Sequence, residues 1–375
     1  MINPKELFEL MIAKDVNFFS GVPDSLLKDF NAYIMDNMDQ NKHIITANEG
    51  AAVALAAGSY LATKKISVVY LQNSGLGNAI NPLVSLTDYE VYNIPVLLVI
   101  GWRGEPGERD EPQHKKQGEI TLELLKTLKI PYEVISENTD NIEEKIDIAF
   151  KHMVEFNSPY ALVIKKNTFE KYNYKNKIKQ NFEMSREEAI QIIVKNLDQD
   201  NITISTTGMI SRELFETRKN MSHEHNKDFL VVGSMGHASQ IALGIAISKP
   251  KKQVFCLDGD GSTIMHMGGL GIIGSKQVKN FKHIVLNNEA HDSVGGQPTV
   301  GNNIDFVSVA MSCKYKNTCS VKTRTDLEEK IKWLKKVEGP GFLEIKVNKG
   351  HRKDLGRPSS DLKKNKEAFM EFLSR

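Results

Sequence analysis

Two turns in the second half of the chain carry residues whose side chains can hold a divalent cation. The turn 258–262 reads DGDGS and follows the apolar segment 254–257, and the turn 287–290 reads NNEA and follows the apolar segment 283–286. Both apolar segments are typical of buried strands. The carboxyl ends of parallel strands meet at one edge of an open α/β sheet, where such sheets bind their ligands. The sequence therefore predicts that the two turns lie side by side.

Together the two turns offer an oxygen-only ligand set of low charge. It consists of the Asp260 carboxylate, the Asn288 amide oxygen and the Ala290 main-chain carbonyl. Such a set suits Mg²⁺ or Ca²⁺ whose remaining positions are filled by phosphate oxygens and water. The metal therefore implies a phosphorylated cofactor, to which Gly261 and Ser262 can offer an amide and a hydroxyl donor.

One glutamate in the first half has surroundings that suit proton transfer. Glu49 stands between the strand-like segment 43–47 and an expected helix, 50–61, that is rich in alanine and glycine. A carboxyl group among such neighbours is poorly hydrated, which raises its pKa and lets it share a proton near neutrality. The plainer interpretation is a first-turn glutamate that only complements the helix dipole.

Short β-branched runs alternate with helical patterns along the whole chain. Segments 66–71 and 95–100 are typical of strands, and segments 26–37 and 50–61 are typical of helices. This alternation predicts an α/β fold of doubly wound parallel sheets, whose apolar strands are covered on both faces. The 375 residues correspond to about two domains.

The expected domain boundary is a polar stretch near the middle of the chain. Residues 167–184 are rich in lysine and asparagine and lack an apolar period, as connections between domains do. We therefore expect a first domain over 1–166, a linker over 167–184 and a second domain over 185–375. A proline precedes the last expected strand of each half, at Pro159 and Pro340, which suggests two α/β domains of similar plan.

Composition excludes several classes of partner. The 49 lysines and arginines nearly balance the 47 aspartates and glutamates, so no field of one sign points to nucleic acid or to a membrane surface. The start of the chain lacks a basic segment followed by an apolar run, and the apolar stretch 95–102 is too short to span a bilayer. We expect a cytoplasmic protein in which Cys256 is a buried strand thiol rather than a reactive one.

Gly-Asp-Gly at 259–261 is followed by Asn-Asn at 287–288. This pair of motifs, at this spacing, resembles the signature of thiamine-diphosphate enzymes. Two further segments agree with it: 233–238 (GSMGHA), before an apolar helix, and 205–208 (STTG), after a short strand. The resemblance implies thiamine diphosphate and Mg²⁺ as cofactors, with Asp260, Asn288 and Ala290 as metal ligands. It assigns to cofactor binding Glu49, Thr207, Gly208, Ser234, Met235, Gly236, His237, Ala238, Asp260, Gly261, Ser262 and Asn288.

The resemblance also implies individual roles. Glu49 corresponds to the carboxylic acid that hydrogen-bonds to the aminopyrimidine ring, so the first half is the pyrimidine-binding domain and the second half the diphosphate-binding domain. Met235 either supports a bent cofactor or fills the core, and His237 either lies along the cofactor or is an ordinary loop histidine. In this family the cofactor lies between domains of different subunits, which implies at least a homodimer.

The halves are joined without a third domain, which makes the chain similar to the compact decarboxylases that act on phosphonopyruvate or sulfopyruvate. Segments 21–28, 71–82, 101–114 and 291–297 carry the closer resemblance to those that act on phosphonopyruvate. It implies conversion of 3-phosphonopyruvate to phosphonoacetaldehyde and CO₂. Sulfopyruvate decarboxylation and carboligation are the alternatives within the family. A non-catalytic nucleotide-binding module is a further alternative, suggested by a Gly-x-Gly at 75–77 that lacks the third glycine of a dinucleotide fingerprint.

Physically, these segments suit an anion site. Ser25 and Asn78 lie at expected helix starts, and Arg103 and His114 flank a Gly/Pro-rich loop that can fold over the site. Asp24 and Ser25 alternatively form only a helix cap, and Arg103 only a solvated loop charge. We expect His114 to carry protons and the following residues to bind substrate: Asp24, Ser25, Asn78, Arg103 and His291.

Overall fold

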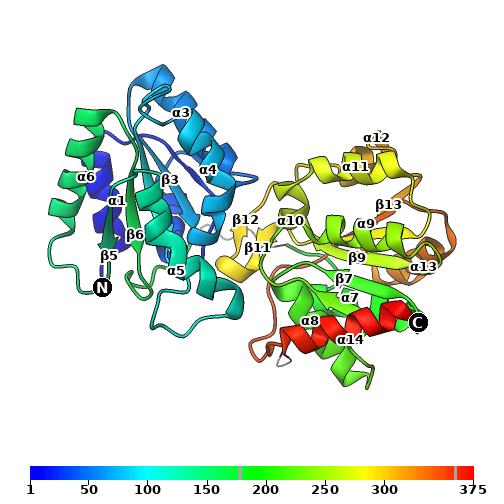
Figure 1. Ribbon diagram of the computed structural model, residues 1–375. Helices are drawn as coiled ribbons and strands as arrows, with labels where there is room; N and C mark the ends of the chain where they lie inside the picture. The colour runs from blue at the N-terminus through cyan, green and yellow to red at the C-terminus, as the bar shows by residue number, and fades with distance from the viewer. Residues whose placement is uncertain (176–179, 359–360) are drawn as a thin grey trace. The chain divides into compact units, whose positions relative to one another are not determined.

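The computed structural model describes residues 1–175, 180–358 and 361–375. The chain divides into two compact units, Met1–Ile178 and Lys179–Arg375, each built around a six-stranded sheet (Figure 1). The expected linker, 167–184, includes residues 176–179, which lie outside the described residues. Within the described ranges, no helix combines the length and the apolar character that crossing a bilayer requires.

The sheet of the first unit has the strand order β2-β1-β3-β4-β6-β5, and all its neighbouring strands are parallel. Its strands are β1 (Phe19–Gly21), β2 (His43–Ile45), β3 (Ser67–Gln72), β4 (Val96–Gly101), β5 (Tyr132–Ile135) and β6 (Tyr160–Ile164). Its helices are α1 (Pro4–Ala13), α2 (Lys28–Asn37), α3 (Glu49–Thr63), the 3₁₀ turn η1 (Asn73–Gly75), α4 (Leu76–Ser85), α5 (Pro112–Thr127) and α6 (Ile142–Phe156).

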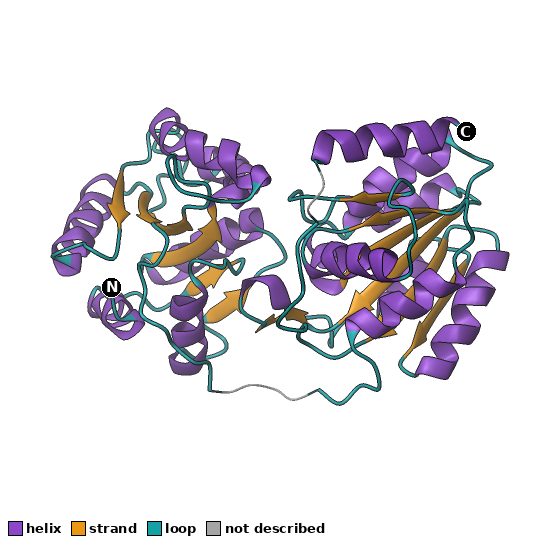
Figure 2. Ribbon diagram, turned by 90° about the horizontal axis from the view of Figure 1, so that it is seen from below, coloured by secondary structure: helices purple, strands orange, loops and turns teal. Residues whose placement is uncertain are grey.

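Alternate residues of the central strands face two separate cores. Val68 and Tyr70 of β3 join the core formed with α1, α2 and α6. Val69 and Leu71 of the same strand join the core formed with α3, α4 and α5. Because side chains alternate along a strand, an apolar run of this kind requires cover on both faces. Helices lie on both faces of the sheet in Figure 2, as predicted.

The sheet of the second unit is also parallel throughout, in the order β13-β14-β10-β9-β7-β8. Its strands are β7 (Ile202–Ser205), β8 (Asp228–Leu230), β9 (Val254–Gly259), β10 (Phe281–Asn287), β13 (Asn317–Val321) and β14 (Gly341–Lys346), beside a two-stranded sheet of β11 (Ala290–His291) and β12 (Gln297–Pro298). Its helices are α7 (Arg186–Asn196), α8 (Met209–Asn220), α9 (Ala238–Ser248), α10 (Asp260–Met265), α11 (Gly268–Lys276), the 3₁₀ turn η2 (Asp292–Val294), α12 (Phe306–Ser312), α13 (Arg324–Lys336) and α14 (Leu362–Ser374).

This second sheet likewise separates two cores. Phe255 and Leu257 of β9 face the core that contains α7, α8 and α13. Val254 and Cys256 face the core that contains α9, α11, α12 and α14. Cys256 is fully buried, in agreement with its interpretation as a strand thiol.

The two sheets have the same strand order once the second is read from β8. The sequence β8-β7-β9-β10-β14-β13 then matches β2-β1-β3-β4-β6-β5 strand for strand. Pro159 and Pro340 precede β6 and β14, which are equivalent strands in this comparison. The predicted α/β fold of two doubly wound parallel domains of similar plan is confirmed.

Parts of the expected linker pack against the units themselves. The Phe169 ring stacks on Phe30, with centroids 5.5 Å apart, and the Tyr172 hydroxyl donates to Asp36 Oδ2 at 3.0 Å. In the second unit, Gln180 Nε2 donates to the main-chain oxygen of Asn288 at 2.7 Å. Burial of aromatic side chains is favourable even in a polar stretch, so the part of this segment that contains Phe169 and Tyr172 packs on the first unit.

Candidate active site

Glu49 is the first residue of α3, and its carboxylate is buried in the first unit. Asn48 caps the helix, because its side chain accepts the Ala51 N–H at 2.9 Å. Glu49 is only 5% exposed, and Asn78 Nδ2 donates to its Oε2 at 2.7 Å. The Glu49 carboxylate is therefore buried at the start of α3, a helix rich in small residues.

Gly75 makes room for this carboxylate. A Cβ at position 75 would lie 2.5 Å from Cδ of Glu49 and closer still to Oε1. The φ of Gly75 is −77°, which any residue adopts, so the close approach of Glu49 is what requires glycine here. The first glycine of the Gly-x-Gly segment therefore borders a carboxylate.

Burial raises the pKa of Glu49 above its ordinary value, and the hydrogen bond from Asn78 opposes that rise. The cause is loss of hydration, which disfavours the charged form. This direction agrees with the sequence-based expectation. A carboxyl group of this kind can hold or share a proton near neutrality, which a fully exposed first-turn glutamate does not do.

A second polar group in the first unit surrounds Asp24, at the end of β1. Asp24 is fully buried against Gly101; its Oδ1 accepts the Leu26 N–H at 2.9 Å, and its Oδ2 has no partner among the described residues. Burial raises the pKa of Asp24 to about 6, against the opposing charge of Arg103. An orphaned buried carboxylate oxygen is costly, and the capping bond to Leu26 does not account for it.

Arg103 is a mostly buried ion-pair partner and not a solvated loop charge. Its Nε and Nη2 bind the two oxygens of Asp110 at 2.7 and 2.5 Å, and its Nη1 donates to Ser25 Oγ at 2.8 Å. The Arg103 side chain is 19% exposed. Three of the five guanidinium N–H groups are therefore used, and two have no partner among the described residues.

His114 lies in the first turn of α5, beside the Arg103 loop. Burial, with the charge of Arg103, lowers the pKa of His114 to about 4. Its Nδ1 has no partner among the described residues. The imidazole is therefore neutral near neutrality, where it can accept or donate one hydrogen bond but carries no charge.

In the second unit, the two oxygen-rich turns do lie side by side. β9 and β10 are adjacent, with Asp258 opposite Val285 and Gly259 opposite Leu286. Asp260 then begins α10, and its buried carboxylate accepts the hydroxyl of Thr299. The predicted meeting of the two strand ends is confirmed.

The surroundings of Asp260 suit a cation. Burial raises the pKa of Asp260 to about 6, because its charged form is poorly hydrated. A divalent ion would favour the ionised form. Gly301 approaches closely, since a Cβ there would lie 2.6 Å from Asp260 Oδ2 and 2.7 Å from Asn287 Oδ1. A side chain at position 301 would therefore collide with the oxygens of Asp260 and Asn287.

Asn288 and Ala290 follow on the neighbouring turn. Asn288 Oδ1 accepts the Ala290 N–H at 3.3 Å, and Asn288 Nδ2 donates to Asp292 Oδ2 at 2.7 Å. His291 comes next in β11, and its Cε1 lies 3.0 Å from where a Cβ of Gly261 would be. Burial lowers the pKa of His291 to about 4. His291 therefore lies against the Asp260 turn as a neutral imidazole.

The three segments expected near the diphosphate are bonded to one another. Ser262 Oγ lies 2.8 Å from Thr206 Oγ1 and accepts the Gly236 N–H at 3.1 Å. Thr207 Oγ1 accepts the Gly233 N–H at 3.1 Å. The structure thus brings the loops before α8, α9 and α10 together at one edge of the sheet.

Residues 234–237 turn tightly before α9, with φ of 43° at Ser234 and 84° at Gly236, and Gly208 precedes α8 with φ of 96°. Met235 is only partly buried. His237 is exposed; its Nδ1 lies 3.2 Å from Met235 O, and its ring centroid lies 4.4 Å from that of His266. These contacts are local, so they leave both interpretations of His237 open.

Three residues at these positions were not singled out from the sequence. They are Asp110, Asp292 and Thr299, which contact Arg103, Asn288 and Asp260 respectively. Asp292 follows directly on His291 in a segment that was considered, so its carboxylate was an available signal. The other two act through contacts that only folding creates.

Comparisons with known proteins agree with this arrangement. Residues 5–125 match the thiamine pyrophosphate enzyme N-terminal TPP binding domain, and residues 204–345 match the thiamine pyrophosphate enzyme C-terminal TPP binding domain. The first match covers Glu49 and the second covers Asp260 and Asn288.

Three relatives are similar over nearly their whole length. Phosphonopyruvate decarboxylase of Streptomyces viridochromogenes is 31% identical, over 96% of this chain and 91% of its own. Phosphonopyruvate decarboxylase of Streptomyces hygroscopicus is 29% identical, over 100% of this chain and 94% of its own. Sulfopyruvate decarboxylase of Methanosarcina acetivorans is 28% identical, over 96% of this chain and 95% of its own. The chain therefore belongs to the family of thiamine pyrophosphate enzymes that includes phosphonopyruvate decarboxylase.

Proposed function

We propose that the protein catalyses the thiamine-diphosphate- and Mg²⁺-dependent decarboxylation of 3-phosphonopyruvate to phosphonoacetaldehyde and CO₂, a step of phosphonate biosynthesis. The observation that carries the proposal is its similarity, over more than nine-tenths of their length, to two phosphonopyruvate decarboxylases. The buried Glu49 and the oxygen-rich turns of the second unit supply the groups that such chemistry needs.

The proposed metal ligands are Asp260, Asn288 and the main-chain oxygen of Ala290. They are hard oxygen donors, two of them side chains that are almost fully buried. One carboxylate balances one of the two positive charges of Mg²⁺ and leaves the other to be balanced by a diphosphate. The residues therefore fit Mg²⁺ held together with a phosphorylated cofactor, and they would not favour Zn²⁺, which prefers nitrogen and sulfur.

The loops bonded through Ser262 are proposed to hold the diphosphate. When bound, thiamine diphosphate supplies the cationic ring that takes up the electron pair left behind by the departing CO₂. The proposed contacts are Glu49, Thr207, Gly208, Ser234, Met235, Gly236, His237, Ala238, Asp260, Gly261, Ser262 and Asn288. Glu49 would hold a proton against the pyrimidine ring, a role supported by its burial and its raised pKa.

The proposed substrate contacts surround Arg103. Its two remaining N–H groups suit the phosphonate, with Ser25 beside them. Asp24 and His114 lie next to this group, and His114 is the proposed proton carrier. Asn78, expected to bind substrate, bonds instead to Glu49 through one N–H, which leaves its second N–H for the substrate. His291 is proposed to reach the substrate from the second unit.

We propose a homodimer or larger homo-oligomer with active sites at subunit interfaces. The support is an exposed set of large apolar side chains on α3, α4 and the turn that follows α4: Leu55, Leu61, Val84, Tyr89, Val91 and Tyr92. Three of them, Tyr89, Val91 and Tyr92, lie within four positions of the chain, and neighbouring exposed apolar side chains are typical of interaction surfaces. Light scattering on the purified protein gives the mass, and a monomer would contradict the proposal.

Sulfopyruvate decarboxylation is the second candidate, because the Methanosarcina relative is similar over an equal length. The deciding measurement is kcat/KM for phosphonopyruvate, sulfopyruvate and pyruvate, before and after metal and thiamine diphosphate are stripped. We expect phosphonopyruvate to be preferred and activity to return only when both are restored. A preference for pyruvate would contradict both phosphonopyruvate and sulfopyruvate as the substrate. A carboligation product formed with added acetaldehyde would reveal a carboligase.

Two substitutions test the assigned residues. Glu49→Gln keeps the shape of the side chain but cannot ionise, so we expect retained folding and cofactor binding with turnover reduced by several orders of magnitude. Asp260→Ala is expected to weaken Mg²⁺ and cofactor binding instead. Near-normal turnover in the first variant, or unchanged metal dependence in the second, would remove that residue from its role.

A further inference from the structure

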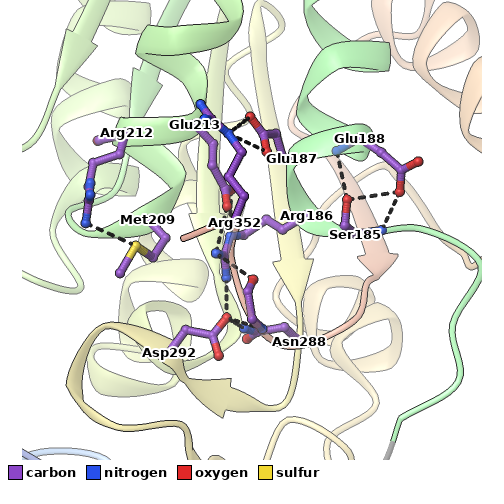
Figure 3. Close-up of polar contacts among 12 residues, drawn as sticks. Ser185, Arg186, Glu187, Glu188, Met209, Arg212, Glu213, Asn288, Asp292 and Arg352 are labelled. Carbon is purple, nitrogen blue, oxygen red and sulfur yellow. Dashed lines mark hydrogen bonds and ion pairs between the residues drawn. The ribbon is translucent and has the colours of Figure 1, made fainter. Parts of the chain in front are cut away.

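A buried ion-pair network lies directly behind Asn288 (Figure 3). Asp292 Oδ2 accepts three hydrogen bonds, from Asn288 Nδ2 at 2.7 Å, from Arg186 Nη1 at 2.7 Å and from the Gly350 N–H at 3.0 Å. The side chains of Arg186 and Asp292 are 4% and 8% exposed. Buried charges are retained at a cost in free energy, so this network calls for a function.

Arg186 is itself held rigidly. It is the first residue of α7, next to a capping box made by Ser185 and Glu188. Its Nε and Nη2 bind the two oxygens of Glu213 on α8 at 2.7 and 2.9 Å. A bidentate pair fixes the plane of the guanidinium, so Nη1 has one direction in which to point. That direction is toward Asp292.

The network determines which end of the Asn288 amide faces which neighbour. Asp292 Oδ2 already accepts from Arg186 Nη1 and from the Gly350 N–H, so it faces Asn288 as a hydrogen-bond acceptor. Only the NH₂ end of Asn288 can therefore face Asp292. The oxygen must face the other way, where it accepts the Ala290 N–H at 3.3 Å and keeps a second lone pair.

We propose that Asp292 and Arg186 are positioning residues that lock the Asn288 amide with its oxygen presented to the metal. This inference rests on the proposed metal role of Asp260 and Asn288 and adds the part of the chain that orients one ligand. Ligand-orienting neighbours of this kind typically contribute about 10- to 100-fold to metal affinity. Neither Asp292 nor Arg186 needs to touch the metal, the cofactor or the substrate.

The test is Mg²⁺ titration calorimetry on the full-length protein with thiamine diphosphate saturating. Asp292→Ala removes the acceptor, so the amide can turn over, and we expect the Mg²⁺ Kd to rise about 10- to 100-fold. Asp292→Asn keeps an oxygen in place of Oδ2, because Arg186 and Gly350 both still donate there. We expect its Kd to lie near that of the wild type.

Two further variants separate positioning from a merely structural role. Arg352→Gln is the matched control: Arg352 pairs with Glu187, Glu216 and Asp354 in the same region, and within the described part of the chain it forms no hydrogen bond or ion pair with Asn288 or Asp292. Its Mg²⁺ Kd should be unchanged. Arg186→Lys keeps a positive charge beside Glu213 but loses the planar guanidinium that also binds Asp292, so the Mg²⁺ Kd of this variant should rise. If Asp292→Ala does not fold, Arg186→Lys takes its place in the test.

A double-mutant cycle completes the test. If Asp292 acts through the Asn288 amide, Asp292→Ala should have no further effect on Mg²⁺ binding in an Asn288→Ala background. An undiminished effect there, or wild-type affinity in Asp292→Ala alone, overturns the positioning role. Wild-type Mg²⁺ affinity in Asn288→Ala alone is a different failure, because it removes the metal assignment itself.

Discussion

Asn78 Nδ2 donates to Glu49 Oε2 at 2.7 Å, so an exposed amide on α4 anchors one oxygen of a buried carboxylate on α3. The other oxygen, Oε1, borders Gly75 at the end of η1. The carboxylate is thus held from two sides by residues that precede or begin one helix. Each contact can be removed separately.

Substitution of Gly75 tests the close approach. A Cβ in Gly75→Ala would overlap the Glu49 carboxyl group, so we expect a fall in kcat approaching that of Glu49→Gln, with little change in the circular dichroism of the folded protein. Gly77→Ala is the control, because a Cβ there meets no atom within 4 Å. Equal activity of the two alanine variants would contradict the assigned contact.

Removal of the Asn78 amide is expected to shift a pH profile. The hydrogen bond from Asn78 lowers the pKa of Glu49, against the effect of burial. In Asn78→Ala the carboxyl group should therefore keep its proton to higher pH, so the ionisation of Glu49 in kcat/KM against pH moves upward. Asn81→Ala, an exposed change on the same helix, should leave the profile in place. A downward shift in Asn78→Ala would refute the interaction.

Asp24→Asn is expected to stabilise the protein near neutrality. Burial raises the pKa of Asp24 from 3.8 to about 6, so the folded state binds this proton more tightly than the unfolded state. The resulting stability is complete below about pH 3.8 and is lost as the pH rises through about 6. Above that range the ionised side chain costs up to roughly 3 kcal/mol, which a neutral asparagine avoids.

The measurement is thermal unfolding of Asp24→Asn and wild type at both ends of that pH range. The variant should unfold at a higher temperature on the alkaline side, and the difference should shrink on the acid side. A constant difference at every pH would mean that the Asp24 charge is not responsible.

Arg103→Lys tests recognition of the substrate anion. Lysine cannot bind Asp110 through a fork and contact Ser25 as well, so the cation should lose its fixed position. We expect kcat/KM for phosphonopyruvate to fall about 10- to 100-fold, as the loss of charge-assisted hydrogen bonds predicts, with a smaller change for pyruvate. Arg109→Lys, at an exposed position of the same loop, serves as control. An equal loss for both substrates would argue against contact with the phosphonate.

The sequence was sufficient for the architecture. Apolar runs such as 96–100 can be buried only in a sheet covered on both faces, and helical segments between them permit only parallel crossovers. The positions of Asp260 and Asn288 followed from the same rule, because residues at the carboxyl ends of adjacent parallel strands must meet. Glu49 could be selected because its small-residue neighbours predict burial.

What the sequence could not supply were partners brought together by folding. Asp110 binds Arg103 because the intervening loop closes on itself, and Thr299 reaches Asp260 from beyond β12. Arg186 and Asp292 lie 106 positions apart and meet only because the start of α7 lies beside the turn after β10. The burial of a segment and the alternation of its side chains between two faces depend on neighbouring residues, so the sequence predicts them. Hydrogen-bond partners depend on distances between side chains that are remote in sequence, and only the packed tertiary structure determines these.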